Sequence, residues 1–325
     1  MLRFNRLVSG GIITNYDCSS KCKHCVYASS PAWPKDYMPA ELAGEIFLLL
    51  KQSGCNSIHI GGGEPLLHPE KLFPVLKAAG DHRIQIEYVE TNASWHKDLD
   101  KTGDLLRQLQ GHGVHTLLVS IDPFHNEFIP FCKVKGLLEA CRQHRMDVFP
   151  WLMEFWGDLD AMGDAERHSP EEYERFFGSG YQLRLMKRYQ LNLRGRALQT
   201  YKRYIRSVPL RQILEGSAPC KELWGTHHFH IDLYGNFIPQ SCPGLSIYFK
   251  DLSDGAKVEK YPVLYSLSME GIKGLFDFAV KSYGFIPEEN YTGKCDLCFD
   301  IRKFLVMEKK ADLPDLQPYG HYIHM

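Results

Sequence analysis

Residues 57–65 read SIHIGGGEP, a short apolar strand that runs directly into three glycines, a glutamate and a proline. Strand-like and helix-like segments alternate on both sides of this stretch. Strands are expected at 11–16, 57–60, 84–90, 116–121, 148–155 and 183–193, and helices at 39–53, 69–79, 102–110, 131–144 and 170–177. Repeated strand–helix units joined by short loops predict parallel strands with crossover connections.

The predicted fold class is therefore α/β, a partial (β/α)6 TIM-like barrel with a small C-terminal α+β domain. In such a barrel the chemistry lies at the carboxyl ends of the strands. The pattern changes after Ser207, where 228–232 and 237–239 flank a turn at Gly235 and predict a β-hairpin. We expect domains at 1–207 and 208–310, followed by a tail at 311–325 that is loose or strapped to the surface.

The composition is that of a soluble globular protein. Of the 325 residues, 44% are hydrophobic and 24% charged, with a net charge of −1. No apolar run is long enough to span a membrane, and the first eleven residues lack the apolar core of a secretory signal. Ten cysteines in such a chain indicate metal ligands or catalytic thiols in a reducing cytoplasm. We expect a cytoplasmic protein with no membrane or nucleic-acid partner.

Three cysteines lie close together after the first expected strand. Cys18, Cys22 and Cys25 form C-x-x-x-C-x-x-C, which can hold three corners of a cubane iron–sulfur cluster and leaves one iron open. The alternative from the spacing alone is a zinc site completed by His24.

With the Gly61–Pro65 motif at the end of the second expected strand, this triplet resembles the radical S-adenosylmethionine (SAM) superfamily, over about residues 10–200. The resemblance implies that the three cysteines ligate a catalytic 4Fe–4S cluster whose open iron binds the SAM methionine group. Gly62, Gly63 and Glu64 match the GGE motif that receives the methionine ammonium. His24 occupies the slot where the family usually places an aromatic ring near the adenine. The implied reaction is reductive cleavage of SAM to a 5′-deoxyadenosyl radical, which abstracts hydrogen from a substrate.

Polar side chains at the other expected strand ends are further candidates for binding SAM. They are Thr91, Asn92, Ser120, Asp122, Asn192 and Arg194, while Glu154 and His125 lie near the same mouth. Each of them taken alone is more often a helix cap or turn residue than a ligand. Ser120 and Asn192 are the favoured candidates, since each ends an expected buried strand.

A second cysteine set lies in the C-terminal third. Cys220, Cys242, Cys295 and Cys298 can saturate one zinc or one iron–sulfur cluster. Their arrangement around the expected hairpin resembles the SPASM and twitch extensions of radical SAM enzymes. Full SPASM domains use seven cysteines, and Gly235 lies further from Cys242 than is usual. We therefore expect one auxiliary 4Fe–4S cluster of the shorter twitch type, with structural zinc as the alternative.

Three cysteines remain outside both sets. Cys55 and Cys141 are expected to be plain buried thiols, and Cys132, nearer the mouth, is a candidate hydrogen donor.

The resemblance implies that the substrate is a peptide or protein, modified by crosslinking, epimerisation or oxidation. It also implies a one-electron donor such as flavodoxin or ferredoxin. The enzymatic alternative is small-molecule or cofactor biosynthesis. The non-enzymatic alternative is a zinc- or cluster-stabilised binding protein.

Overall fold

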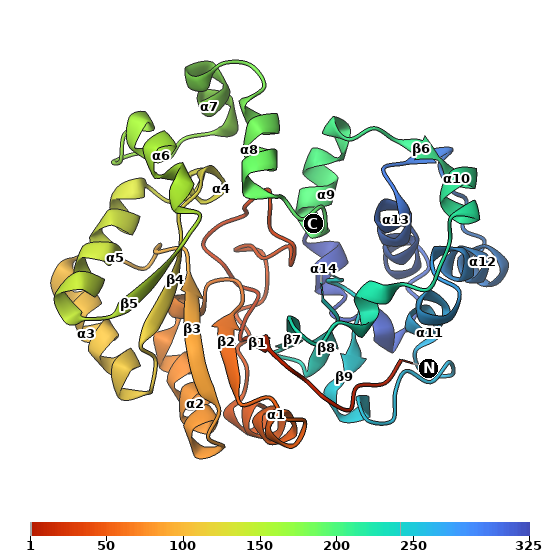
Figure 1. Ribbon diagram of the computed structural model, residues 1–325, viewed down its shortest axis with the longest axis horizontal. Helices are drawn as coiled ribbons and strands as arrows, with labels where there is room; N and C mark the ends of the chain where they lie inside the picture. The colour runs from red at the N-terminus through yellow and green to blue at the C-terminus, as the bar shows by residue number, and fades with distance from the viewer. Residues whose placement is uncertain (1, 241) are drawn as a thin grey trace. The chain divides into compact units, whose positions relative to one another are not determined.

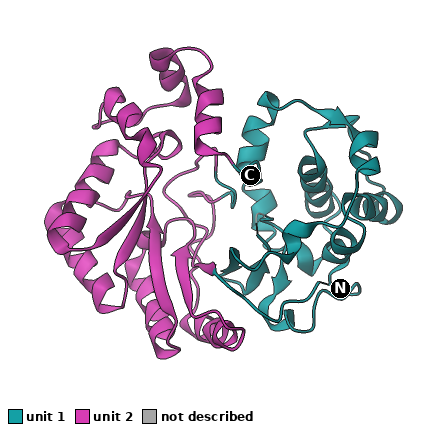
Figure 2. Ribbon diagram, in the orientation of Figure 1, with its two compact units in different colours: residues 1–9, 25–28, 192–325 teal, residues 10–24, 29–191 magenta. Residues whose placement is uncertain are grey.

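The computed structural model describes residues 2–240 and 242–325, and its contacts divide the chain into two units (Figure 2). Unit 2 contains Gly10–His24 and Ser29–Leu191. Unit 1 contains the residues up to Ser9, the short segment Cys25–Ala28, and the chain from Asn192 onward. The main division thus falls before Asn192, earlier in the chain than the change of sequence pattern at Ser207.

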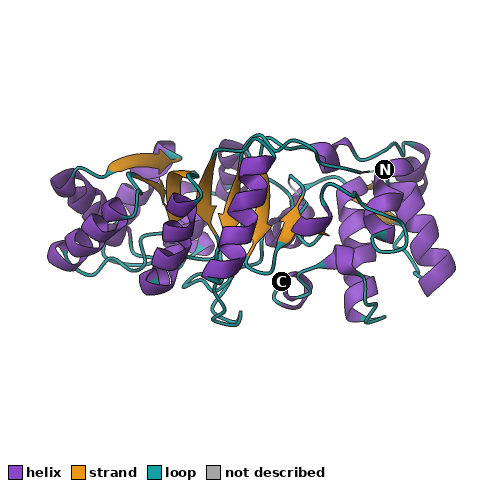
Figure 3. Ribbon diagram, turned by 90° about the horizontal axis from the view of Figure 1, so that it is seen from below, coloured by secondary structure: helices purple, strands orange, loops and turns teal. Residues whose placement is uncertain are grey.

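Unit 2 is built on five parallel strands with helices along one face (Figure 1, Figure 3). Neighbouring strands follow the chain order, from β1 to β5, and this confirms the predicted α/β fold class. The strands are β1 (Gly10–Ile13), β2 (Ser57–Gly61), β3 (Gln85–Thr91), β4 (Thr116–Ser120) and β5 (Asp147–Trp151). The helices between them are α1 (Ala40–Gln52), α2 (Pro69–Asp81), α3 (Leu99–Gly111), α4 (Pro123–Asn126) and α5 (Phe131–His144).

The core of unit 2 lies between the sheet and these helices. Ile60, Val89 and Val119 on the strands are fully buried, as are Leu76 and Leu106 on the helices. Burying a side chain of this size contributes about 1.5–3 kcal/mol, so this layer supplies much of the stability of the unit.

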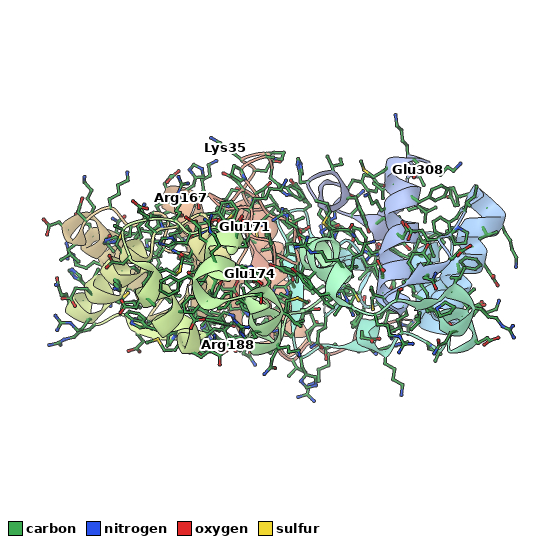
Figure 4. The ribbon with its side chains drawn as sticks, turned by 90° about the horizontal axis from the view of Figure 1, so that it is seen from above. Lys35, Arg167, Glu171, Glu174, Arg188 and Glu308 are labelled. Carbon is green, nitrogen blue, oxygen red and sulfur yellow. The ribbon has the colours of Figure 1, made fainter. Side chains whose placement is uncertain are left out.

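The predicted sixth strand at 183–193 is wrong, because this segment forms helix α8 (Tyr181–Tyr189). Tyr181 and Leu185 are both buried, with the four-residue spacing of one helix face. Glu174 on α7 (Pro170–Phe177) accepts hydrogen bonds from two backbone N–H groups, of Gly180 just before α8 and of Gln182 in its first turn. Arg188, labelled in Figure 4, lies near the end of α8. It pairs with Asp158 at 2.7 Å. The sequence therefore folds as a helical connection, α6 (Trp156–Met162), α7 and α8, and the parallel part of the sheet has five strands.

The absence of a sixth strand leaves β5 as the last strand of the sheet. Within the described residues, the backbone hydrogen bonds of β5 run only toward β4. Pro150 lies in this edge strand, where a residue without an N–H group costs little and discourages pairing with another chain.

Unit 1 combines short strands with helices, as predicted for the C-terminal part. Its helices are α9 (Gly195–Tyr201), α10 (Leu210–Glu215), α11 (Pro262–Met269), α12 (Ile272–Tyr283), α13 (Lys294–Met307) and α14 (Gly320–Ile323). Its strands are β6 (Val208–Pro209), β7 (Phe229–Asp232), β8 (Asn236–Ile238), β9 (Ile247–Tyr248) and β10 (Asn290–Tyr291).

The predicted hairpin is confirmed as β7 and β8, with antiparallel pairing of His230 with Ile238. Its turn depends on Gly235, which has φ +80°, and on Asp232, whose carboxylate accepts the N–H groups of Tyr234 and Asn236 at 2.9 and 3.0 Å.

The tail at 311–325 is strapped down. Asp315 is fully buried and accepts the first N–H groups of α11, from Val263 and Leu264, at 2.7 and 2.9 Å. Leu316 and Tyr322 are buried as well. Single contacts anchor this segment, and it forms no long helix. Its sequence therefore shows no helical periodicity.

Within the described part of the chain, no helix combines the length and hydrophobicity needed to cross a membrane.

Candidate functional site

The first cysteine set lies in the loop after β1. Cys18 and Cys22 are 7% and 5% exposed and belong to unit 2, while Cys25 is half-buried and groups with unit 1. None of these three cysteines forms a disulfide. The Asn92 amide lies 3.6 Å from the Cys18 sulfur, as a donor to a thiolate would. Soft sulfur ligands protected from solvent fit an iron–sulfur cluster.

The glycine turn at the end of β2 is packed against the strand end that leads into this loop. The Gly63 N–H donates to the Asn15 carbonyl at 2.7 Å, and the Glu64 N–H donates to the Asp17 carbonyl at 3.0 Å. A Cβ on Gly63 would lie 2.0 Å from the Asp17 oxygen, and Gly62 has φ +154°. We expected these glycines to permit close approach of a ligand. In the structure they permit close approach of the cysteine-bearing segment.

Glu64 is completely buried behind this turn. Its carboxylate accepts hydrogen bonds from the Leu66 N–H (3.1 Å), the Thr91 hydroxyl (3.0 Å) and the Asn92 N–H (2.7 Å). Burial nevertheless raises the pKa of Glu64 to about 7. Within the described residues this carboxylate forms no ion pair, although the charge of His125 acts on it. The ammonium of SAM would supply a direct cationic partner. Thr91 and Asn92, predicted to bind SAM, thus act here as donors that orient Glu64.

An aromatic cluster surrounds His24. Its ring stacks on Phe124, with centroids 4.7 Å apart, and meets the Tyr189 ring edge-on at 5.0 Å. The His125 ring lies 4.9 Å away. Flat ring surfaces of this kind suit a purine. Phe124 and Tyr189 were missed by the sequence analysis because neither belongs to a motif, and Tyr189 was assigned to a strand.

Asp122 and His125 form a buried pair at the end of β4. Asp122 accepts the His125 backbone N–H at 3.0 Å, and its other oxygen lies 2.8 Å from the His125 Nδ1. Burial alone would lower the pKa of His125, but Asp122 and the Cys22 sulfur outweigh it and raise that pKa. Ser120 lines a small cavity beside this pair. Asp122 is therefore the N-cap of α4 and also a partner of His125.

Asn192 and Arg194 do not end a strand, as we had expected. They follow α8 and belong to unit 1, where the Arg194 N–H donates to the Asn192 carbonyl at 2.8 Å. Arg194 precedes α9 and lines a cavity of unit 1.

That cavity brings together the second cysteine set. It is lined by Cys220, Cys242, Cys295 and Cys298, which come from two loops and the first turn of α13. Burial raises the pKa of Cys220 and of Cys242 to about 12. Four thiols held together in this way become thiolates only when a metal centre takes up their charge.

A buried arginine borders the same cavity. Arg302 is 4% exposed, and its guanidinium donates to the carbonyls of Cys298 and Pro243 and to the Tyr322 hydroxyl, at 3.3, 2.9 and 2.9 Å. All three acceptors are neutral, and no ion pair involves Arg302 within the described residues. A metal centre with four thiolates is anionic and would balance this charge.

The remaining cysteines lie apart from both sets. Cys55 and Cys141 are fully buried, as predicted. Cys132 is exposed in the first turn of α5, and its backbone N–H donates to the Asp164 carbonyl at 2.7 Å.

Comparison with known proteins finds one match to a family model, in the first half of the chain. Residues 12–152 match the sequence model of the radical SAM superfamily. No curated protein matches the chain.

Several solved structures are similar at low sequence identity. Native anSMEcpe with bound AdoMet is 13% identical, with a TM-score of 0.45, over 93% of this chain and 98% of the other. BtrN in complex with AdoMet and 2-DOIA is 14% identical, with a TM-score of 0.41, over 85% and 90%. Streptococcus suis SuiB bound to precursor peptide SuiA is 14% identical, with a TM-score of 0.35, over 97% and 75%.

The buried carboxyl of Glu64 makes stability depend on pH. Its pKa is about 7 in the folded chain and about 4.5 when unfolded, so the folded state holds the proton more tightly. Stability therefore falls as the pH rises through 7. We expect Glu64→Gln to remove about 1 kcal/mol of the loss between pH 6 and pH 8, measured by urea unfolding at both values.

Glu171→Gln is the control, since this residue is exposed on α7 (Figure 4). An identical pH dependence in wild type and in Glu64→Gln would contradict a raised pKa for Glu64.

Proposed function

This chain carries a radical SAM domain over residues 12–152, and on that premise we propose that it is a radical SAM enzyme whose catalytic cluster is held by Cys18, Cys22 and Cys25. The observation that carries the proposal is the packing of the Gly63–Glu64 turn against the segment that leads into Cys18. The packing supports the proposal because Glu64 and Cys18 then belong to two segments in direct contact.

The residues of the chain have distinct roles in this proposal. Glu64 binds the methionine ammonium, and Thr91 and Asn92 hold Glu64 in place. The rings of His24 and Tyr189 receive the adenine. With an electron from a donor such as flavodoxin or ferredoxin, the bound cluster supplies reductive cleavage of SAM to methionine and a 5′-deoxyadenosyl radical.

We further propose one auxiliary 4Fe–4S cluster in unit 1, held by Cys220, Cys242, Cys295 and Cys298. Their shared cavity and the uncompensated charge of Arg302 support a centre with four thiolates. Full ligation by the protein leaves no open iron, so this cluster serves structure or electron transfer.

The proposed substrate is a peptide. Support comes from β5, the last strand of the sheet, where Phe149 and Trp151 are 44% and 39% exposed. These two residues alternate along the strand with the spacing of side chains in an extended polypeptide. Large aromatic side chains that are exposed next to one another indicate a binding surface.

Replacement of Cys18, Cys22 and Cys25 by Ala tests the catalytic cluster. We expect the iron content after anaerobic reconstitution to fall from about eight to about four per chain, since one of two cubanes is lost. Formation of 5′-deoxyadenosine from SAM and dithionite should cease. SAM cleavage by the triple variant would contradict the assignment.

The auxiliary cluster has a separate test. Cys295→Ala combined with Cys298→Ala should also leave about four irons per chain, while Cys132→Ala, outside both sets, should leave about eight. About four irons and one zinc in the wild type, purified without oxygen, would show that the second site is structural zinc.

Transfer of deuterium tests the substrate class. The reconstituted enzyme is given SAM and either a perdeuterated peptide digest or a perdeuterated small-metabolite fraction. Because the radical takes hydrogen from the substrate, we expect deuterium in 5′-deoxyadenosine only with the peptides. Deuterium from the metabolite fraction alone would favour small-molecule chemistry.

A further inference from the structure

The sheet of unit 2 has a second face, opposite to the one that the helices cover. Strand pairing aligns Glu90 on β3, Leu118 on β4 and Phe149 on β5 in a single row across this face. His59 on β2 lies on the same face, since its Nε2 is 3.8 Å from a Glu90 oxygen. This face therefore carries polar and aromatic side chains. A face packed in a hydrophobic core would carry mainly aliphatic side chains.

Aromatic rings continue along this face from β2 to β5. The His59 ring stacks on Tyr88 at 5.1 Å, Tyr88 meets Phe149 edge-on at 6.0 Å, and Phe149 meets Trp151 edge-on at 6.0 Å. The Trp151 Nε1 then lies 3.4 Å from the Tyr189 hydroxyl. Since Tyr189 contacts His24, the row leads from Glu90 to the cysteine loop.

Glu90 is the one carboxylate in this row, and its surroundings differ sharply from those of Glu64. Its side chain is 41% exposed, and within the described residues no group donates a hydrogen bond to it. His59, at 3.8 Å, is its sole ion-pair partner there, beyond hydrogen-bond distance. The enclosing protein and the neighbouring Glu64 still raise the pKa of Glu90 to about 7.

Gly61 on β2 lies directly against this carboxylate. A Cβ on Gly61 would lie 2.8 Å from a Glu90 oxygen, so a larger residue there would crowd it. Two strand spacings, about 10 Å, separate the backbones of Glu90 and Phe149, and Leu118 forms the floor between them. The row therefore carries a carboxylate on β3 and an aromatic ring on β5, with an aliphatic side chain between them.

From this arrangement we infer that Glu90, with Tyr88 and Phe149, binds the cationic side chain of a lysine or arginine in the peptide substrate. A carboxylate without a donor attracts an N–H cation, and aromatic faces add a cation–π interaction. The inference rests on the proposed peptide substrate, and it assigns the feature by which that peptide is recognised. The cationic side chain would anchor the peptide along the row that ends at His24.

Binding of short peptides to the reconstituted enzyme with SAM tests this site without turnover. The probes are acetyl-Ala-Ala-Lys-Ala-Ala-amide and the same peptide with norleucine in place of lysine, compared by ligand-observed NMR titration. We expect the lysine peptide to bind wild type at least about tenfold more tightly. Glu90→Gln should abolish that preference, while Glu41→Gln, exposed on α1, should retain it.

A second variant guards against loss of folding in Glu90→Gln. Tyr88→Leu keeps the carboxylate and removes one ring, so the lysine preference should weaken about two- to fivefold. Equal binding of the two peptides by wild type, or an unchanged preference in Glu90→Gln, would overturn the inference.

Butylammonium as a third probe distinguishes the source of the cation. A peptide gains contacts along the aromatic row, so butylammonium should bind more weakly than the lysine peptide. Equal affinity would overturn the peptide assignment.

Formation of 5′-deoxyadenosine by the wild type without peptide is measured in parallel. If no 5′-deoxyadenosine formed, the proposed radical SAM activity would be contradicted. The peptide-binding comparison would still decide whether Glu90 recognises a cationic side chain.

Discussion

The arrangement of unit 2 depends on the contact between two backbone segments, the end of β1 and the turn after β2. Gly63 approaches Asp17 so closely that any side chain at that position would overlap the carbonyl oxygen. Two backbone hydrogen bonds hold the segments together. The contact fixes where Cys18 enters its loop and where Glu64 turns inward, so one steric constraint aligns the metal ligands with the carboxylate.

Buried charge without a matching partner occurs in both units, with opposite sign. In unit 2, Glu64 is enclosed with hydrogen-bond donors and forms no ion pair within the described residues. In unit 1, Arg302 is enclosed with neutral acceptors beside four cysteines. Isolated charges are costly in a protein interior, so each of them indicates a bound group of the opposite sign. A cationic cofactor fits the first site and an anionic metal centre fits the second.

Loss of the sixth strand has a functional consequence. In unit 2 the chain after β5 forms α6, α7 and α8, which leaves the edge strand and its aromatic side chains exposed. Pro150 limits unwanted pairing at that edge. The same helices bring Tyr189 to His24, so the connection that replaces a strand also completes the aromatic cluster beside the cysteine loop.

Local chemistry in the sequence determined the α/β class, the cysteine sets and the glycine–glutamate turn, because hydrophobic periodicity and ligand spacing are properties of neighbouring residues. The hairpin at Gly235 was predictable for the same reason. The apolar spacing of 183–193 predicted a strand. Only the tertiary structure decided that this segment is helical, because Glu174 and Asp158 hold it from other elements. Tertiary structure likewise showed that Thr91 and Asn92 serve Glu64, that Arg194 belongs with the second cysteine set, and that Glu90 faces aromatic rings. Each of these depends on contacts between residues far apart in the chain, which no local pattern records.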